Sequence, residues 1–164
     1  MVEQLTAFEQ LPDSTRLWIY QSNRPLRAEE IEDIRQKLRQ FARKWVSHNR
    51  ALRAWGDVFY ERFVVLMVDE SQADASGCSI DKSVYFLKDL QATYGIDLFN
   101  RMQFSYEDET GQVHTVDRDA FVRAYREGKI NDDTLVFDTL IEDKAAFQAA
   151  FRKPLRESWH ARLV

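Results

Sequence analysis

The stretch FVVLMVDE, residues 63–70, decides the fold, because its first six residues are all apolar. An almost wholly apolar strand is typical of the centre of a sheet. The stretch LRAWGDVFY, residues 52–60, also favours a strand, and only Glu61 and Arg62 lie between the two. So short a connection predicts an antiparallel hairpin in which residues 63–70 take the inner position.

A strand and a long helix are predicted before this hairpin, and a second helix after it. RLWIYQS, residues 16–22, is a β-branched and aromatic run with polar neighbours, which favours a strand. The second helix is expected from near Ser79 to Gly95, where glycine suits the left-handed conformation that follows a helix. The first helix is predicted from an apolar stripe with steps of three and four residues, formed by Ile31, Ile34, Leu38, Phe41 and Trp45.

Shorter elements are predicted in the last third of the chain. Residues 102–116 alternate as two strands around a turn near Thr110 and Gly111. Asp117 is a typical N-cap for a short helix that ends near residue 128. A further strand over 134–138 and a helix over 142–153, halted by a proline, are expected before the tail.

The predicted order over the first two thirds is strand, helix, strand, strand, helix, strand. This βαββαβ order predicts an α+β protein with a ferredoxin-like antiparallel sheet, covered on one face by both helices. We expect one domain over residues 1–164, with a core at about 16–116 and C-terminal additions at about 117–164. The additional strand and helix cover the other face of the sheet or one of its edges.

Composition excludes several classes of function. The net charge of −4 gives no broad attraction to nucleic acid, and no apolar run reaches the roughly 18 residues of a membrane span. The five glycines are isolated, so the glycine-rich nucleotide-binding motifs are missing, and the three histidines lack zinc-site spacing. We expect no metal and no cofactor. MVEQLTAFEQLPDS, residues 1–14, lacks a signal-peptide pattern and the cysteine is single, so we expect a cytoplasmic protein.

Cys78 is the first candidate site residue. It lies where the second helix begins, and unpaired backbone amides together with the helix dipole stabilise a thiolate there. Asp81 opposes this effect, and Lys82 partly offsets Asp81. One hypothesis is a redox or acyl-transfer nucleophile with His160 as its base, provided that the tail crosses back over the sheet. The alternative is a small buried residue that packs closely beside Gly77.

A non-covalent anion site at the same helix end is a further hypothesis. Amides around Ser79 hold a phosphate or a carboxylate, and Arg24 and Arg101 reach it if they lie at that end of the sheet. We expect the loops after the first and third strands to be neighbours, because both helices begin at one edge. Asp69 and Glu70, in the acidic stretch DESQADAS, either line this site or belong to a solvated connection.

Six stretches, in order along nearly the whole chain, resemble a family of small bacterial proteins of unknown function. They are LWIYQSNRPL (17–26), RFVVLMVDES (62–71), SGCSIDKSVYFL (76–87), DLFNRM (97–102), TLVFDTLI (134–141) and PLRESWHARL (154–163). Some proteins of that family carry the label ABC transporter ATPase. VVLMVDES imitates the strand of a Walker B motif, but no phosphate-binding loop accompanies it, which argues against Walker-type ATP hydrolysis. The resemblance therefore implies no catalytic residue.

The leading prediction is a non-catalytic binding or interaction protein. Its partner is another protein or a second copy of the chain, bound through a free sheet edge or through the C-terminal additions. The alternatives are a small Cys78-dependent enzyme and an anion-binding module at the start of the second helix. Trp159 either anchors the tail in an apolar slot or presents an aromatic side chain and His160 to a partner.

Overall fold

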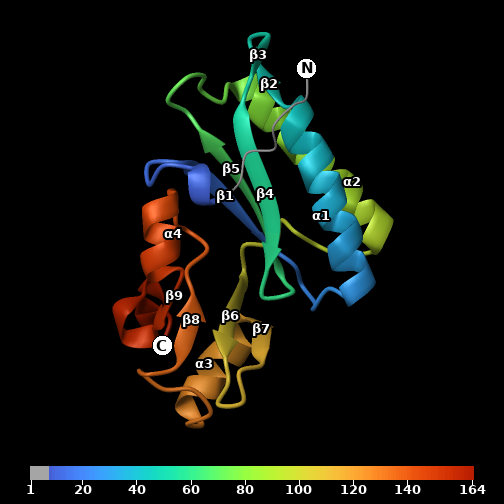
Figure 1. The fold of residues 1–164 in the computed structure, drawn as a ribbon. Coiled ribbons are helices and arrows are strands. Elements are labelled where there is room, and N and C mark those ends of the chain that lie inside the picture. The colour runs from blue at the N-terminus through green and yellow to red at the C-terminus, as the bar shows by residue number, and fades with distance from the viewer. Residues whose placement is uncertain (1–7) are drawn as a thin grey trace.

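The computed structural model describes residues 8–164, which form two antiparallel sheets, a small hairpin and several helices (Figure 1). The strands are β1 (Arg16–Gln21), β2 (Val46–Ser47), β3 (Arg50–Ala51), β4 (Arg53–Phe59), β5 (Phe63–Asp69), β6 (Gln103–Glu107), β7 (Val113–Asp117), β8 (Leu135–Phe137) and β9 (Arg152–Pro154). The α-helices are α1 (Ala28–Lys44), α2 (Gly77–Tyr94), α3 (Arg118–Arg126) and α4 (Lys144–Ala150). Short 3₁₀ helices are η1 (Phe8–Gln10), η2 (Leu155–Glu157) and η3 (Trp159–Arg162).

The first sheet has the order β1, β5, β4, and all its pairs are antiparallel. Every residue of β5 is buried, so the prediction that this stretch forms the central strand is confirmed. β4 and β5 form the predicted hairpin, with Phe59 paired to Phe63. Tyr60 and Glu61 in its turn take positive φ angles of 54° and 57°.

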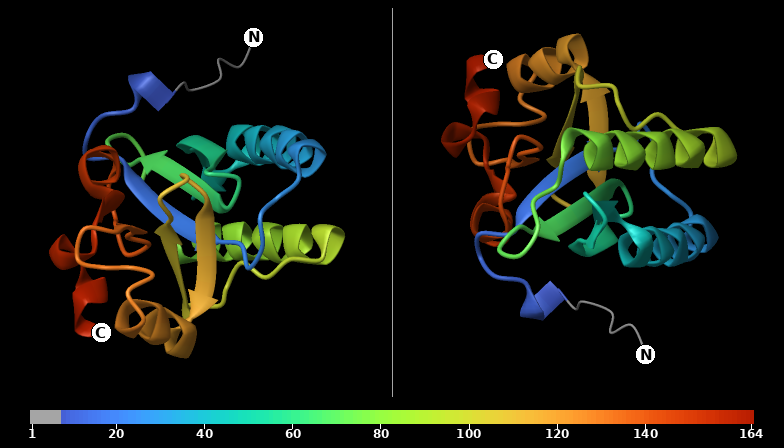
Figure 2. Two further views of the ribbon diagram at one scale, coloured as in Figure 1. Left: turned by 90° about the horizontal axis from the view of Figure 1, so that it is seen from below. Right: turned by 90° about the horizontal axis from the view of Figure 1, so that it is seen from above.

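Helices α1 and α2 cover one face of this sheet, as predicted (Figure 2). Ile34 and Leu38 of α1 and Leu87 of α2 are wholly buried in the apolar core between the layers. Trp45 ends the stripe of α1, and its Nε1 donates a hydrogen bond to the carbonyl oxygen of Ser79 at 2.8 Å. This bond ties the C-terminal end of α1 to the first turn of α2.

The C-terminal additions cover the opposite face of the first sheet (Figure 2). Phe63 and Met67 of β5 pack there in an apolar cluster with Phe137, Phe147 and Phe151. The expectation that these additions cover the other face or an edge is confirmed for the face. The predicted helix over 142–153 is too long, because α4 ends at residue 150 and the next residues form β9 against β8. Backbone before a proline favours the extended conformation that β9 adopts.

The strand after α2 does not join the first sheet. β6 begins a second sheet with the order β7, β6, β8, β9, and Figure 1 shows it beyond the end of β1. Phe104 of β6 packs on Phe121 of α3 in a third apolar cluster. The α+β class is confirmed, but the ferredoxin-like arrangement is not, because the sheet is split. The single domain over residues 1–164 stays a prediction.

A buried arginine joins the two sheets. Arg62, just before β5, is 6% exposed. Its Nη1 donates to the hydroxyl of Thr115 at 2.7 Å, and its Nη2 donates to the carbonyl oxygen of Val113 at 3.1 Å. Both acceptors lie on β7. The two sheets are therefore held together by a charged donor as well as by apolar contacts.

Three further predictions concern a signal peptide, a membrane span and a metal site. The residues 1–7, in the stretch without a signal-peptide pattern, lie outside the described residues. Among residues 8–164, no helix combines the length and the apolar character that a membrane crossing requires. The same residues contain no group of three or more side chains placed to hold a metal ion.

Candidate functional site

One edge of the first sheet is open, because β1 pairs with β5 on one side only. The amide of Ser22 donates to the carbonyl oxygen of Arg62 at 2.8 Å. With the register of the two strands, this bond shows which residues of β1 turn their backbone N–H and C=O groups toward β5. Even-numbered residues of the strand direct their backbone groups to β5. Those of Leu17, Ile19 and Gln21 therefore face away from it. Within residues 8–164, the backbone N–H and C=O of Ile19 have no hydrogen-bonding partner.

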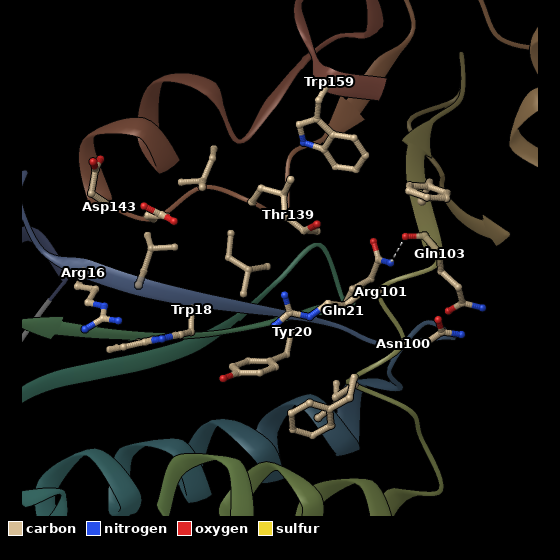
Figure 3. Close-up of a pocket in the computed structure, with 18 of the residues that line it drawn as sticks. Arg16, Trp18, Tyr20, Gln21, Asn100, Arg101, Gln103, Thr139, Asp143 and Trp159 are labelled. Carbon is tan, nitrogen blue, oxygen red and sulfur yellow. Dashed lines mark hydrogen bonds between the residues drawn. The ribbon is translucent and has the colours of Figure 1, made fainter. Parts of the chain in front are cut away.

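A cavity of about 820 Å³ lies along this open edge, and we call it the edge groove (Figure 3). β1 forms its floor, and the segments 98–104 and 139–143 form its walls. Its lining is both apolar and polar, and includes Trp18, Ile19, Tyr20, Gln21, Leu98, Phe99, Arg101, Gln103, Leu140 and Trp159. In a ferredoxin-like sheet, the strand after the second helix would fill this position. Because β6 pairs elsewhere, the position is open.

Both ends of the edge groove are closed. At one end, the amide of Leu17 donates to the carbonyl oxygen of Glu142 at 3.0 Å, and the amide of Lys144 donates to that of Thr15 at 2.9 Å. At the other end, Nε2 of Gln21 donates to the carbonyl oxygen of residue 103, where β6 begins, at 3.1 Å. The open window therefore runs from residue 17 to residue 21, a span of roughly 13 Å of extended chain.

The two ends of the groove carry different charges. Figure 3 draws Arg101 beside Gln21 and Tyr20 at the β6 end. None of the residues 8–164 forms an ion pair or a hydrogen bond with the exposed Arg101 guanidinium. Burial raises the pKa of the Tyr20 hydroxyl, and the positive charge of Arg101 offsets part of that rise, so the two groups are close.

The far end of the groove is acidic. Glu70, Glu142 and Asp143 line it, together with one cation, Arg16. The Arg16 Nη1 atom lies 3.8 Å from a carboxylate oxygen of Glu70, and its guanidinium stands 4.7 Å from the centre of the Trp18 ring. The Asp143 carboxylate accepts a hydrogen bond from the first turn of α4 at 2.8 Å. Glu142 is exposed, and no ion pair is found for it within the described part of the chain.

The structure places Arg24 far from the predicted anion site. Both Nη atoms of Arg24 bind the carboxylate of Glu30 at 2.9 Å, and Nη2 also donates to the carbonyl oxygen of Tyr94 at 2.7 Å. Tyr94 is the last residue of α2, whereas Ser79 is in its first turn. The expectation that Arg24 and Ser79 are neighbours is wrong. Because β1 and β5 are antiparallel, the loops that follow them lie at opposite ends of the sheet.

The remaining predicted anion-site residues are also used locally. Ser79 is buried, and its amide donates to the hydroxyl of the N-cap Ser76 at 3.2 Å. Asp69 is buried and accepts hydrogen bonds from the amide of Ser71 at 3.0 Å and from Arg53 at 3.2 Å. Burial alone raises the pKa of Asp69, but these bonds outweigh burial and lower it. Of the predicted anion-site residues, Arg101 and Glu70 alone line the edge groove.

Cys78 and His160 are not brought together. Cys78 is exposed in the first turn of α2, so its alternative role as a small buried residue is wrong. His160 is 1% exposed and packs in the third apolar cluster against Phe104, stacked on Trp159. Burial lowers the pKa of His160 to about 4. Its Nδ1 forms a hydrogen bond with the hydroxyl of Ser158 at 2.6 Å, and no residue in the described chain forms a hydrogen bond with its Nε2.

Sequence reasoning missed most of the edge groove. The sequence predicts Trp18 and Tyr20 as strand residues and Trp159 as an anchor of the tail or a contact for a partner, but it does not place them in a common site. Trp159 does anchor the tail, because its Nε1 donates to the carboxylate of Asp138 at 2.8 Å. The signal that could have found the groove is the charge of Arg16 and Arg101. These two residues flank the strands at 16–22 and after the second helix, which the ferredoxin-like prediction pairs with each other.

Comparisons with models of protein families, with curated proteins and with solved structures return no match to this chain. The resemblance to a family of small bacterial proteins therefore stays a prediction, and the functional argument depends on the geometry of the chain itself.

Proposed function

We propose that this protein is a non-catalytic interaction protein that binds an extended peptide segment in the edge groove, as an additional strand beside β1. The observation that carries the proposal is the open backbone of Ile19, whose N–H and C=O both face the cavity without a partner among residues 8–164. Strand addition is a common mode of peptide recognition, in which main-chain hydrogen bonds supply affinity and side-chain pockets supply specificity.

The dimensions of the groove support a short peptide. A window of roughly 13 Å accepts four or five residues of extended chain. The carbonyl of Leu17 and the amide of Gln21 face the same way as the two groups of Ile19, so up to four main-chain hydrogen bonds are available. The partner strand would take the position that completes a ferredoxin-like sheet. A cytoplasmic location, expected from the single cysteine, belongs to the same proposal.

The closed ends of the groove favour a peptide over the sheet edge of a second copy. The bridge between residues 16 and 143 and the bond from Gln21 to residue 103 close the window at both ends. Segments 98–104 and 139–143 rise on either side of it. A folded sheet edge is wider than a single strand, because its neighbouring strand follows at about 4.8 Å. A single extended segment enters such a window more easily.

The test is selection of a random phage-displayed library of about twelve-residue peptides on the full chain. We expect enriched peptides to lose at least roughly tenfold in affinity on Ile19→Pro, which removes the outward N–H, and to keep it on Ile19→Val. Thr139→Trp, which fills the groove from its wall, should have the same effect, with Thr139→Ser as its control. This second pair keeps the test valid if the proline variant does not fold.

Two results would overturn the proposal. One is the absence of enriched peptides, or of any effect of both Ile19→Pro and Thr139→Trp on those that are enriched. The other is a mass, measured by light scattering, that doubles with concentration for the natural chain and not for Thr139→Trp. That result assigns the groove to a second copy of the chain instead of a peptide.

A further inference from the structure

The edge groove is electrically polarised along β1. Its β6 end carries Arg101, whose positive charge has no described anionic partner. Its other end carries three carboxylates, of Glu70, Glu142 and Asp143, against the single charge of Arg16. A strand in the groove therefore meets a positive end near residue 21 of β1 and a negative end near residue 17.

The direction of the bound strand follows from the rest of the sheet. Both existing pairs, β1 with β5 and β5 with β4, are antiparallel. The existing contact at this edge, between residues 16 and 143, is antiparallel as well. Antiparallel pairing is also slightly more stable for each residue than parallel pairing. A strand that runs opposite to β1 has its N-terminal residue at the Arg101 end and its C-terminal residue at the Glu142 end.

The alternation of side chains assigns a face to each residue of the bound strand. Trp18 and Tyr20 point to the face of the sheet that α1 and α2 cover, and Leu17 and Ile19 to the opposite face. Residues directly opposite one another in an antiparallel pair share a face. The two peptide residues opposite Trp18 and Tyr20 therefore contact aromatic rings, which favours β-branched side chains.

We infer that the groove selects peptides with an acidic residue four positions before a basic residue, bound antiparallel to β1 with β-branched residues beside the acidic and basic ends. This inference rests on the proposed function and adds the charge order and direction of the partner. In this arrangement the acidic side chain meets Arg101, and the basic side chain meets Glu142. The opposite charge order places like charges together at both ends, which is unfavourable.

The test compares two fluorescent peptides of one composition, Glu-Val-Thr-Val-Lys and its reverse Lys-Val-Thr-Val-Glu, each flanked by Gly-Ser on both sides. Fluorescence anisotropy measures their dissociation constants for the full chain at low salt. We expect the first peptide to bind roughly tenfold more tightly than the second. Arg101→Glu should remove this preference, whereas Arg126→Glu, a control on the exposed side of α3, should keep it.

The outcomes separate this inference from the proposed function. If both peptides bind equally, compete with library peptides and lose affinity on Thr139→Trp, the groove binds strands without reading their charge order, and the inference alone fails. A preference for the reverse peptide also contradicts it. If neither peptide binds and the library gives no groove-dependent peptide, the proposed function fails as well.

Discussion

The substitution Glu30→Gln tests how the start of α1 is held to the end of α2. The Glu30 carboxylate is buried and accepts two hydrogen bonds from Arg24 at 2.9 Å and one from the amide of Arg27 at 3.0 Å. Arg24 also binds the last carbonyl of α2. Removing one partner of a buried ion pair costs about 3–5 kcal/mol, whereas an exposed pair contributes about 0–1 kcal/mol.

The structure places this pair between the two limits. The side chain of Glu30 is 5% exposed and that of Arg24 is 34% exposed, so water partly compensates Arg24 for its lost partner. We therefore expect Glu30→Gln to lower the free energy of unfolding by about 2 kcal/mol near neutral pH. This loss corresponds to a decrease in Tm of roughly 4–8 °C for a chain of this size.

The effect of Glu30→Gln depends on pH in a defined direction. Hydrogen bonds from Arg24 hold the pKa of Glu30 well below its ordinary value of 4.5. A carboxyl group whose pKa is lowered by folding stabilises the folded state above its unfolded pKa, and this contribution is lost as the pH falls. The glutamine variant lacks this titration. The difference in stability should therefore shrink by about 1.4 kcal/mol for each pH unit below about 4.5.

Urea unfolding at about pH 7, 5 and 3.5 measures the difference, with Glu29→Gln as the matched control. Glu29 is the neighbouring residue, and its side chain is 74% exposed, so its substitution should change stability by less than about 0.5 kcal/mol. The reasoning is refuted if Glu30→Gln and Glu29→Gln cost the same. It is also refuted if the cost of Glu30→Gln is constant from pH 7 to pH 3.5.

Three further substitutions test other parts of the fold. Arg62→Ala should lower the free energy of unfolding by about 2–3 kcal/mol in urea, because two hydrogen bonds from a charged donor between the sheets are lost; a cost below about 0.5 kcal/mol contradicts this. Iodoacetamide should label the exposed Cys78 in the folded protein, at a rate that His160→Ala leaves unchanged. A slower rate in that variant would instead support a catalytic pair of Cys78 and His160. Trp159→Phe should cost about 1–2 kcal/mol, since buried Asp138 loses a donor, and an unchanged Tm argues against this bond.

The helices and the central hairpin could be predicted from the sequence because their signals are local. The apolar run at 63–68 marks the buried strand, and glycine at position 95 ends α2 with a φ of 62°. The stripe that ends at Trp45 predicts the buried face of α1. In each case, one segment carries the whole signal, so no knowledge of its distant neighbours is needed.

The pairing of β6 could not be predicted in the same way. Its alternating residues fit a strand in either sheet, and the choice depends on contacts with β8 and α3, which follow later in the chain. The edge groove exists only because of that choice. The expected anion site failed for a related reason, because it depended on which sheet edge Arg24 and Ser79 share.

The two-sided burial of β5 has a consequence for synthesis of the chain. Of the helices that cover one face of β5, α1 is made before the strand and α2 directly after it. Phe137, Phe147 and Phe151, which pack on its other face, are made much later, within residues 137–151. Until the ribosome has released that segment, Phe63 and Met67 remain in contact with water on a nascent chain whose first sheet is already able to pair. Exposed apolar surface of this kind promotes aggregation of partly folded chains. Residues 137–151 thus protect a strand that is made before them.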